Sequence, residues 1–476
     1  MSTLPVEEID FLVIGSGPAG QKGAIQASKS GKRVVVIEGW ETGGSSLWTA
    51  TIPSKALREA VLDLTNFSTK SFYANQSMLP HTSEISISDL NFRVSWVKEH
   101  LKDTLSRQLK KNRIEVVKGF AKFTDPHEIA VYENDKKIRI FKAEKVLLCP
   151  GSKPRIPSSV SFDGTKICNS TQLLNLDRIP KSMIVIGAGV IGSEYASMFC
   201  ILGSKVTLVD KANRMLPFLD REICSHLQIS LEENNLRFLP KKEYESITVI
   251  GEEVLVTFKD GSEERAEVVL VAAGRTANVD CLEIDQAGLY LGKNGYIEVN
   301  DKYQTKVPHI YAAGDVIGGP NLSSTGQIQG RLAALHACGG SKKGFSSIFP
   351  FGIYTIPEIS YIGRTEEELK AEGILYEVGR AYFYEVSRSV ITGNEFGLCK
   401  IIFDPKNLEI LGAHIIGRGA SELIHIAQLA ISFKAKIDYF VEEVFNFPTF
   451  AEMYRIAALN GINKLKIPKV LRDGNL

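Results

Sequence analysis

The sequence predicts an α/β protein, because one strand–loop–helix–strand pattern occurs twice and a mixed segment of helices and strands follows at the C-terminus. In the first copy, the apolar run IDFLVI at 9–14 leads through a glycine-rich loop and a helix with small residues to RVVVIE at 33–38. In the second copy, MIVI at 183–186 leads in the same way to KVTLVD at 205–210. Each copy is a βαβ unit, and the repetition indicates two domains of similar architecture.

Further elements are expected around the two copies from apolar periodicity and turn residues. Residues 53–67 and 92–111 are predicted as amphipathic helices, the polar stretch 68–90 as a loop, and 114–149 as strands. Glycine-marked strand ends follow at 268–276 and 309–319. The C-terminal segment has expected strands near 399–403 and 410–416 and expected helices near 420–434 and 450–462. A Gly-Ser-x-Pro stretch places a domain boundary near residue 153.

Composition excludes several classes of function. The chain has 476 residues, which suits two or three domains of roughly 100–200 residues each. Its net charge of +1 gives no general attraction for nucleic acid, and no apolar run approaches the roughly 18 residues of a membrane span. The seven cysteines form no CxxC pair, the eight histidines form no HExxH cluster, and the short acidic N-terminus does not resemble a signal peptide. We therefore expect free thiols, no metal site, no nucleic-acid or membrane partner, and a cytoplasmic location.

The three glycines of the first loop have separate roles in a dinucleotide-binding unit. Gly15 makes the tight turn, Gly17 lets the backbone approach a pyrophosphate, and Gly20 lets the helix lie close to the strand. The positive N-terminus of the helix holds the pyrophosphate. Glu38 ends the next strand, 23 residues after Gly15, where a carboxylate can accept both ribose hydroxyls. One such loop is a weak signal, but this one occurs twice with its strand, helix and acidic residue.

The second loop repeats the spacing and the acidic residue at the strand end: Gly187, Gly189, Gly192 and Asp210. Asp210 favours NAD, because a carboxylate repels the 2′-phosphate of NADP. Lys211 and Arg214 lie just beyond it, and their cations would attract that phosphate. The alternative is that both are solvated surface charges. The residues therefore leave open NAD, NADP or both as the ligand.

Further motifs along nearly the whole chain resemble the flavoprotein disulfide reductase family, which includes dihydrolipoamide dehydrogenase and glutathione reductase. They are Gly43-Gly44, IPSKAL at 52–57, Pro-Gly-Ser at 150–152, Ala-Ala-Gly-Arg at 272–275, Ala-Ala-Gly-Asp at 312–315 and Pro-Thr-x-x-Glu at 448–452. The resemblance implies two Rossmann-like nucleotide-binding domains, for FAD and NAD(P), and an α+β C-terminal dimerisation domain. The implied boundaries are 1–152 and 280–349 for the FAD-binding domain, 153–279 for the NAD(P)-binding domain and 350–476 for the dimerisation domain.

The same resemblance implies roles for individual residues. Lys55 should lie beside flavin N5 and pair with Glu194, and Asp315 should accept hydrogen bonds from the flavin ribitol. Hydride transfer to the flavin adds negative charge, which a nearby cation stabilises, and a partly buried lysine needs a partner. The alternative is a surface lysine and a helix-face glutamate. The other cofactor-binding positions implied are Gly43, Gly44, Gly151, Gly274, Arg275 and Gly314.

The chain departs from the disulfide reductases at the residues that handle thiols. Ser46 and Thr51 occupy the positions of the two redox cysteines, and Phe447 replaces the histidine that acts as catalytic base. A hydroxyl forms neither a disulfide nor an attacking thiolate, and phenylalanine takes no proton. Glu452, which would orient that histidine, is expected to be a structural carboxylate bonded to backbone. Disulfide reduction is therefore excluded, whereas the nucleotide and flavin machinery remains.

One branch of the family has this form, the soluble (Si-specific) pyridine nucleotide transhydrogenases. The chain resembles them across GVIGSEYASMF, GIYTIPEIS and FNFPTFAEMYRIAALNGINKL. That branch typically has threonine at the position of Thr51 and an aromatic residue in place of the histidine, but usually keeps the first cysteine, so Ser46 goes one step further. The resemblance implies an oxidoreductase that moves hydride from NADPH through FAD to NAD by a ping-pong mechanism, as a homodimer or larger homo-oligomer.

Two other functions remain open from the sequence. One is an NAD(P)H oxidase or diaphorase of the same fold, which passes electrons to oxygen or quinones. The other is a non-catalytic flavoprotein that serves as a redox sensor or an assembly scaffold. Anaerobic turnover with two nucleotides alone distinguishes the transhydrogenase from the oxidase, and a bound but unreducible flavin would support the scaffold.

Overall fold

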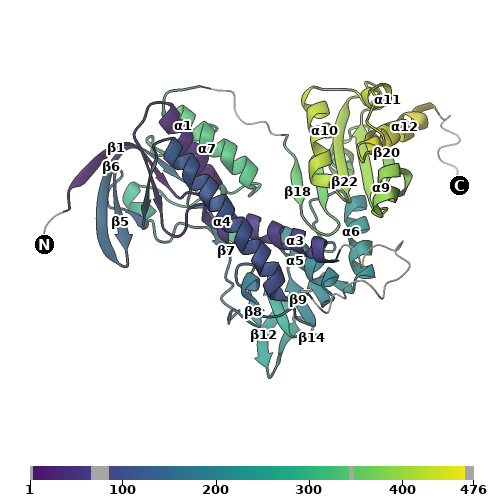
Figure 1. Ribbon diagram of the computed structural model, residues 1–476, viewed down its shortest axis with the longest axis horizontal. Helices are drawn as coiled ribbons and strands as arrows, with labels where there is room; N and C mark the ends of the chain where they lie inside the picture. The colour runs from purple at the N-terminus through teal and green to yellow at the C-terminus, as the bar shows by residue number, and fades with distance from the viewer. Residues whose placement is uncertain (1–3, 66–84, 342–347, 467–476) are drawn as a thin grey trace. The chain divides into compact units, whose positions relative to one another are not determined.

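The computed structural model (Figure 1) describes residues 4–65, 85–341 and 348–466. These residues fall into two units. Unit 1 comprises the described residues of Met1–Leu57, Leu90–Ser158 and Ala273–Phe345. Unit 2 comprises those of Arg58–Asp89, Ser159–Ala272 and Ser346–Leu476.

Unit 1 is built on a seven-stranded sheet with the order β3-β2-β1-β6-β5-β4, in which β17 also pairs with β6. The strands are β1 (Val6–Ile14), β2 (Val34–Glu38), β3 (Glu115–Lys118), β4 (Phe120–Phe123), β5 (Glu128–Glu133), β6 (Lys136–Leu148) and β17 (Ile310–Ala312). β1, β2, β3, β6 and β17 are parallel, whereas β4, β5 and β6 form an antiparallel meander. A short antiparallel pair joins β7 (Ser152–Pro154) to β16 (Arg275–Ala277).

The parallel part of this sheet is buried on both faces. Successive side chains of a strand point to opposite sides, so each strand contributes to the core on either side of the sheet. In β1, Leu12 and Ile14 belong to one hydrophobic core, and Phe11 and Val13 belong to the other. The helices are α1 (Pro18–Lys29), α2 (Gly44–Trp48) and α7 (Ser323–Ala337), while α3 (Thr51–Thr65) begins in this unit and α4 (Ile87–Lys111) ends in it. Helices α1 and α7 lie side by side (Figure 1), and a Cβ at Gly330 would come 2.0 Å from the carbonyl oxygen of Ala19.

Unit 2 contains a second parallel sheet, with the order β11-β10-β9-β15-β8. Its strands are β8 (Ile167–Cys168), β9 (Ser182–Ile186), β10 (Lys205–Val209), β11 (Leu236–Leu239) and β15 (Val268–Val271). Helix α5 (Val190–Ile201) follows β9, and helix α6 (Arg221–Glu233) lies between β10 and β11 in the chain. An antiparallel sheet of β12 (Tyr244–Ile250), β13 (Glu253–Phe258) and β14 (Glu263–Ala266) is inserted before β15.

The C-terminal part of unit 2 is an antiparallel sheet with the order β18-β19-β22-β21-β20. The strands are β18 (Phe351–Ile353), β19 (Ile359–Gly363), β20 (Glu377–Tyr382), β21 (Leu398–Phe403) and β22 (Ile410–Ile416). The helices are α8 (Glu366–Glu372), α9 (Ser387–Thr392), α10 (Ala420–Ser432), α11 (Tyr439–Glu442) and α12 (Glu452–Lys466). Side chains of β21, β22, α10 and α12 form the core of this segment.

The predicted α/β class is confirmed, and the strands and helices named from the sequence are present within a few residues of their expected ends. One expectation was wrong in part. The predicted loop 68–90 falls largely outside the described residues, but its last four residues belong to α4, which begins at Ile87. Ser86 caps this start, because its hydroxyl accepts from the backbone N–H of Asp89 (3.3 Å) and the Asp89 carboxylate accepts from the backbone N–H of Ser86 (3.0 Å).

Among the described residues, no helix has both the length and the apolar character that a membrane span requires.

Candidate nucleotide-binding sites

The first glycine-rich loop joins β1 to α1, and two of its glycines are required by the packing of the chain itself. Gly15 has a φ of +95°, and a Cβ there would lie 2.3 Å from the carbonyl oxygen of Cys149. A Cβ at Gly20 would lie 1.9 Å from the carbonyl oxygen of Gly15. Gly17 differs, because it caps the N-terminus of α1 with an ordinary φ and a Cβ would meet no atom of the described residues within 4 Å. The space in front of Gly17 and the N-terminus of α1 therefore fits a pyrophosphate.

Glu38 lies at the end of β2 with its carboxylate held against this loop. Its Oε2 accepts hydrogen bonds from the backbone N–H and the hydroxyl of Ser16, at 2.8 and 2.6 Å. The hydroxyl of Ser16 in turn accepts from the backbone N–H of Gly43 at 2.9 Å. A Cβ at Gly44 would lie 3.1 Å from Cα of Gly17, so the Gly43-Gly44 segment also borders the loop. No pattern in the sequence indicated the bridging role of Ser16.

Asp315 takes part in a chain of hydrogen bonds that the sequence alone did not reveal. The hydroxyl of Ser152 donates to Oδ2 of Asp315 (2.7 Å) and accepts from Nε of Arg275 (2.7 Å). Burial lowers the pKa of Arg275, although the charge of Asp315 acts in the opposite direction. Gly151, Gly274 and Gly314 all have positive φ values, of 74°, 96° and 80°. These residues therefore form one turn-rich polar cluster within unit 1.

The positions of the two missing cysteines meet at a third hydroxyl. Oγ of Ser46, in α2, lies 2.8 Å from Oγ of Ser323 at the start of α7. Oγ1 of Thr51, the first residue of α3, lies 3.3 Å from the same atom. Three hydroxyl groups thus lie together at the positions where the absence of cysteines excludes a redox disulfide. Ser323 is 272 residues from Thr51 and no motif points to it, so the sequence could not predict this contact.

The second glycine-rich loop, between β9 and α5, repeats the geometry of the first. A Cβ at Gly187, which has a φ of +106°, would lie 2.6 Å from the carbonyl oxygen of Ala272. A Cβ at Gly192 would lie 1.8 Å from the carbonyl oxygen of Gly187, whereas a Cβ at Gly189 would again meet nothing within 4 Å in the part of the chain that the structure describes. The middle glycine is thus the one that packing within the chain does not explain, in both loops.

The acidic residue that follows the second loop is also held in place. Oδ2 of Asp210 accepts from the backbone N–H of Ala188 (2.6 Å), and Oδ1 accepts from that of Ala212 (2.7 Å). Lys211 is exposed, but the side chain of Arg214 is only 23% exposed and lies toward Glu367. Of the two predicted phosphate-binding cations, Lys211 is thus a surface residue and Arg214 is a half-buried one.

The two expected catalytic residues lie in different units, so their pairing remains a prediction. Lys55 is in α3 within unit 1, where its Nζ lies 3.4 Å from Oγ of Ser54. Glu194 is in α5 within unit 2, is 4% exposed, and accepts a hydrogen bond from the backbone N–H of Tyr354 at 2.9 Å.

The region of the missing base lies at the start of α12. Phe447 is 72% exposed, directly before the Pro-Thr motif. Oε2 of Glu452 is buried and has no hydrogen-bond partner among the described residues, so this atom does not make the backbone bond that was expected. The carboxylate that would orient a histidine is therefore present, and within the described ranges one of its oxygens makes no hydrogen bond.

Comparison with known proteins agrees with this geometry. The family model of the pyridine nucleotide-disulphide oxidoreductases matches residues 9–330, and the model of their dimerisation domain matches residues 349–458. The FAD and pyridine nucleotide that the resemblance implies are the cofactors of this family, and the dimerisation domain supports a homo-oligomer.

Curated relatives cover almost the full length. The chain is 41% identical over 463 residues to a protein of Mycobacterium tuberculosis named soluble pyridine nucleotide transhydrogenase, covering 97% of this chain and 98% of that one. It is 40% identical to a protein of the same name from Marinomonas sp., covering 96% and 98%. Among solved structures, LpdA from Mycobacterium tuberculosis superposes with a TM-score of 0.86 at 26% identity, over 94% of this chain and 99% of that one. The chain therefore belongs to the pyridine nucleotide-disulphide oxidoreductase family.

Proposed function

We propose that this protein is an FAD-dependent soluble NAD(P) transhydrogenase, which moves hydride between NADPH and NAD⁺ by a ping-pong mechanism without a redox disulfide. The observation that carries the proposal is the meeting of Ser46, Thr51 and Ser323 hydroxyls in a chain that keeps both glycine-rich loops. Full-length relatives named soluble pyridine nucleotide transhydrogenase support it.

Within unit 1, the residues around the first loop would hold FAD. Gly17 and the N-terminus of α1 would receive the pyrophosphate, and Glu38 the ribose hydroxyls. Asp315, oriented by Ser152, would accept hydrogen bonds from the ribitol. Bound FAD would supply the redox chemistry, by taking hydride from one nicotinamide and passing it to the next. Lys55 would place a positive charge near the flavin, with Glu194 as its partner.

Within unit 2, one site would bind both pyridine nucleotides in turn. Gly189 and the N-terminus of α5 would receive the pyrophosphate, and the fixed carboxylate of Asp210 would accept ribose hydroxyls. Lys211 and Arg214 would bind the 2′-phosphate when the nucleotide is NADP(H). We propose the domain boundaries given above, a homodimer as the minimum assembly, and the cytoplasm as the location, in keeping with relatives that are named as soluble.

The deciding experiment is anaerobic stopped-flow absorbance of the FAD-loaded enzyme. NADPH is expected to bleach the flavin band, and NAD⁺ added next is expected to restore it without oxygen. If NAD⁺ fails to restore the band while oxygen or a quinone does, the protein is an oxidase or diaphorase. A flavin that neither nucleotide reduces would instead support a sensor or scaffold.

A second prediction concerns the missing disulfide. The double variant Ser46→Cys/Thr51→Cys is expected to show no lipoamide turnover, because Phe447 cannot carry the proton that thiol chemistry needs. The assay is dihydrolipoamide-dependent NAD⁺ reduction, with a dihydrolipoamide dehydrogenase as positive control and transhydrogenation as the measure of intact flavin. Robust lipoamide turnover would mean that position 447 has been assigned the wrong role.

A further inference from the structure

The loop between β10 and α6 is closed onto the glycine-rich loop of unit 2. Oδ2 of Asp210 accepts from the backbone N–H of Ala188 at 2.6 Å, and the backbone N–H of Leu216 donates to the carbonyl oxygen of Ala188 at 3.0 Å. Asp210 and Leu216 of this loop are thus both bonded to Ala188, beside the proposed pyrophosphate site. Arg214 lies between them in the chain, so its backbone is held at the rim of the proposed adenosine ribose site.

The guanidinium of Arg214 has hydrogen-bonding capacity left over. Nη2 donates to the carbonyl oxygen of Pro217, whereas Nη1 is buried and has no hydrogen-bond partner among the described residues. Nη1 lies 3.9 Å from Oε1 of Glu367, and Oε2 of Glu367 is likewise buried without a hydrogen-bond partner in the described part of the chain. Opposite charges therefore face each other across a gap that is slightly too long for a hydrogen bond. A hollow of about 260 Å³ opens beside Arg214 and gives its side chain room to move.

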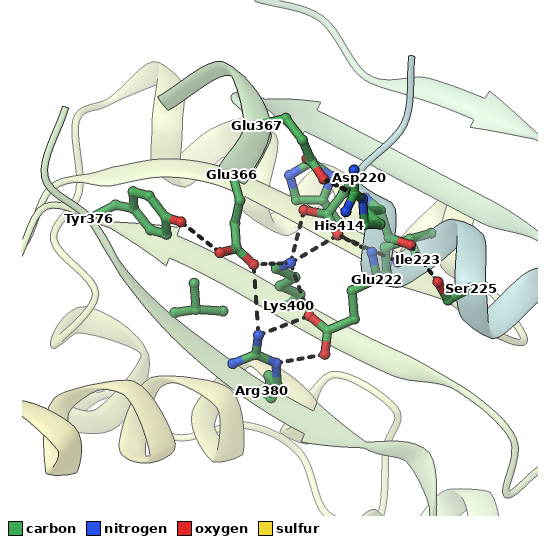
Figure 2. A network of polar contacts seen from close by, with 12 residues as sticks. Asp220, Glu222, Ile223, Ser225, Glu366, Glu367, Tyr376, Arg380, Lys400 and His414 are labelled. Carbon is green, nitrogen blue, oxygen red and sulfur yellow. Dashed lines mark hydrogen bonds and ion pairs between the residues drawn. The ribbon is translucent and has the colours of Figure 1, made fainter. Parts of the chain in front are cut away.

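Glu367 is held at the start of α6, because its Oε1 accepts a hydrogen bond from the backbone N–H of Arg221 at 3.2 Å, and a buried ionic network lies beside it (Figure 2). Its neighbour Glu366 pairs with Nζ of Lys400, which is only 1% exposed. The same Nζ binds both carboxylate oxygens of Asp220, at 2.9 and 2.8 Å, and Oε2 of Glu222 at 2.9 Å. Asp220 caps the N-terminus of α6, so the network ties the start of α8 to the start of α6. Glu367 therefore stays opposite the loop that carries Arg214.

We propose that Glu367 sets the balance between the two nucleotides by competing with the 2′-phosphate of NADP(H) for Arg214. This inference rests on the proposed function, in which one site binds NADP(H) and NAD(H) in turn. With NAD(H) bound, Glu367 partners the Arg214 cation, which would otherwise be half-buried and unpaired. With NADP(H) bound, the phosphate takes the guanidinium, because it offers more charge and more acceptor oxygens than a carboxylate. Glu367 thereby weakens NADP(H) binding enough for exchange, and is a specificity-determining residue that need not touch the nucleotide.

The test measures binding of two adenosine ligands to the oxidised, FAD-loaded enzyme by calorimetry. Adenosine 2′,5′-bisphosphate carries the 2′-phosphate, and 5′-ADP lacks it. Glu367→Gln keeps the size of the side chain and removes its charge. This substitution is expected to increase the affinity for the 2′,5′-bisphosphate by about three- to tenfold and to change the affinity for 5′-ADP by less than about twofold. The matched control is Glu372→Gln at the other end of α8, where Glu372 pairs with Arg364. This control is expected to leave the affinity for both ligands unchanged.

A double variant shows whether Glu367 acts through Arg214. Arg214→Met is expected to lower the affinity for the 2′,5′-bisphosphate by about tenfold. The double variant Arg214→Met/Glu367→Gln is expected to have the same affinity as Arg214→Met alone. Equal effects of Glu367→Gln on both ligands, no effect on either, or a gain that persists without Arg214 would each overturn the proposal. Loss of folding would lower the affinity for both ligands, so it is distinguishable from a selective effect on the 2′,5′-bisphosphate. The titration involves no hydride transfer, so its outcome is independent of whether NAD⁺ reoxidises the flavin.

Discussion

Replacing Lys400 by methionine is expected to lower the free energy of unfolding of unit 2 by about 3–5 kcal/mol, a large part of the roughly 5–15 kcal/mol available to a typical domain. The ammonium is almost fully buried on β21 and neutralises three carboxylates, those of Asp220, Glu222 and Glu366. Methionine fills a similar volume but leaves those like charges facing one another. Burial alone would lower the pKa of Lys400, but the carboxylates outweigh it and raise the pKa, so the lysine is charged at neutral pH.

The measurement is urea unfolding followed by circular dichroism, with Lys406→Met as control. Lys406 is an exposed lysine between β21 and β22 and should change stability by no more than about 0.5 kcal/mol. A loss of less than about 1 kcal/mol in Lys400→Met would show that the network contributes no more than a surface ion pair.

The same network predicts how the effect depends on pH. Burial would raise the pKa of Glu366, but the hydrogen bonds from Lys400 and Tyr376 lower it to about 2. A carboxyl group with a depressed pKa stabilises the fold above its unfolded value of 4.5 and loses that contribution as the pH falls toward about 2. Without Lys400, the carboxylates should take up protons at higher pH. The difference in stability between the wild type and Lys400→Met should therefore shrink as the pH is lowered from about 7 to about 5.

Two alanine substitutions three residues apart are expected to separate folding from ligand binding. In Gly192→Ala, the new Cβ would lie 1.8 Å from a backbone oxygen, so the helix must move away from the strand. We expect a loss of at least about 3 kcal/mol in stability. In Gly189→Ala, the Cβ meets no atom within 4 Å and the backbone angles suit alanine, so stability should change by less than about 1 kcal/mol. The Cβ would nevertheless occupy the space proposed for the pyrophosphate, and NADH should bind about 100-fold more weakly, which corresponds to about 2.7 kcal/mol.

Thermal unfolding and a fluorescence titration with NADH distinguish the two variants. Unit 1 offers the same comparison, because Gly20→Ala should destabilise the fold and Gly17→Ala should mainly release FAD. Normal NADH binding by a well-folded Gly189→Ala variant would mean that the pyrophosphate does not approach this loop.

The features that the sequence predicted well are local ones. The spacing of Gly15, Gly17 and Gly20 is a short-range pattern whose geometry depends on adjacent turns, and the structure shows the close approaches expected at Gly15 and Gly20. The start of α4 was missed, although Ser86 and Asp89 form a capping box, because the polar character of the preceding stretch concealed it.

Contacts between residues far apart in the chain could not be predicted. Arg214 and Glu367 are on separate segments, and nothing in either local pattern indicates that they meet. Lys400 is the only charged residue in the strand LCKIIF, where a lysine would ordinarily indicate an exposed position. Its burial depends on carboxylates supplied by α6 and α8. Such partners depend on tertiary packing, which the periodicity of the sequence does not reveal.

The cluster of Ser46, Thr51 and Ser323 also bears on how the protein would tolerate oxidative stress. Arsenite, heavy metals and hypochlorite inactivate dithiol enzymes at the redox cysteines, and hydroxyls at these positions offer such reagents no target. The thiols of Cys168, Cys200 and Cys224 are buried, which raises the pKa of each to about 12 and keeps it in the unreactive protonated form. The proposed hydride route would therefore lack the dithiol at which such reagents attack disulfide reductases.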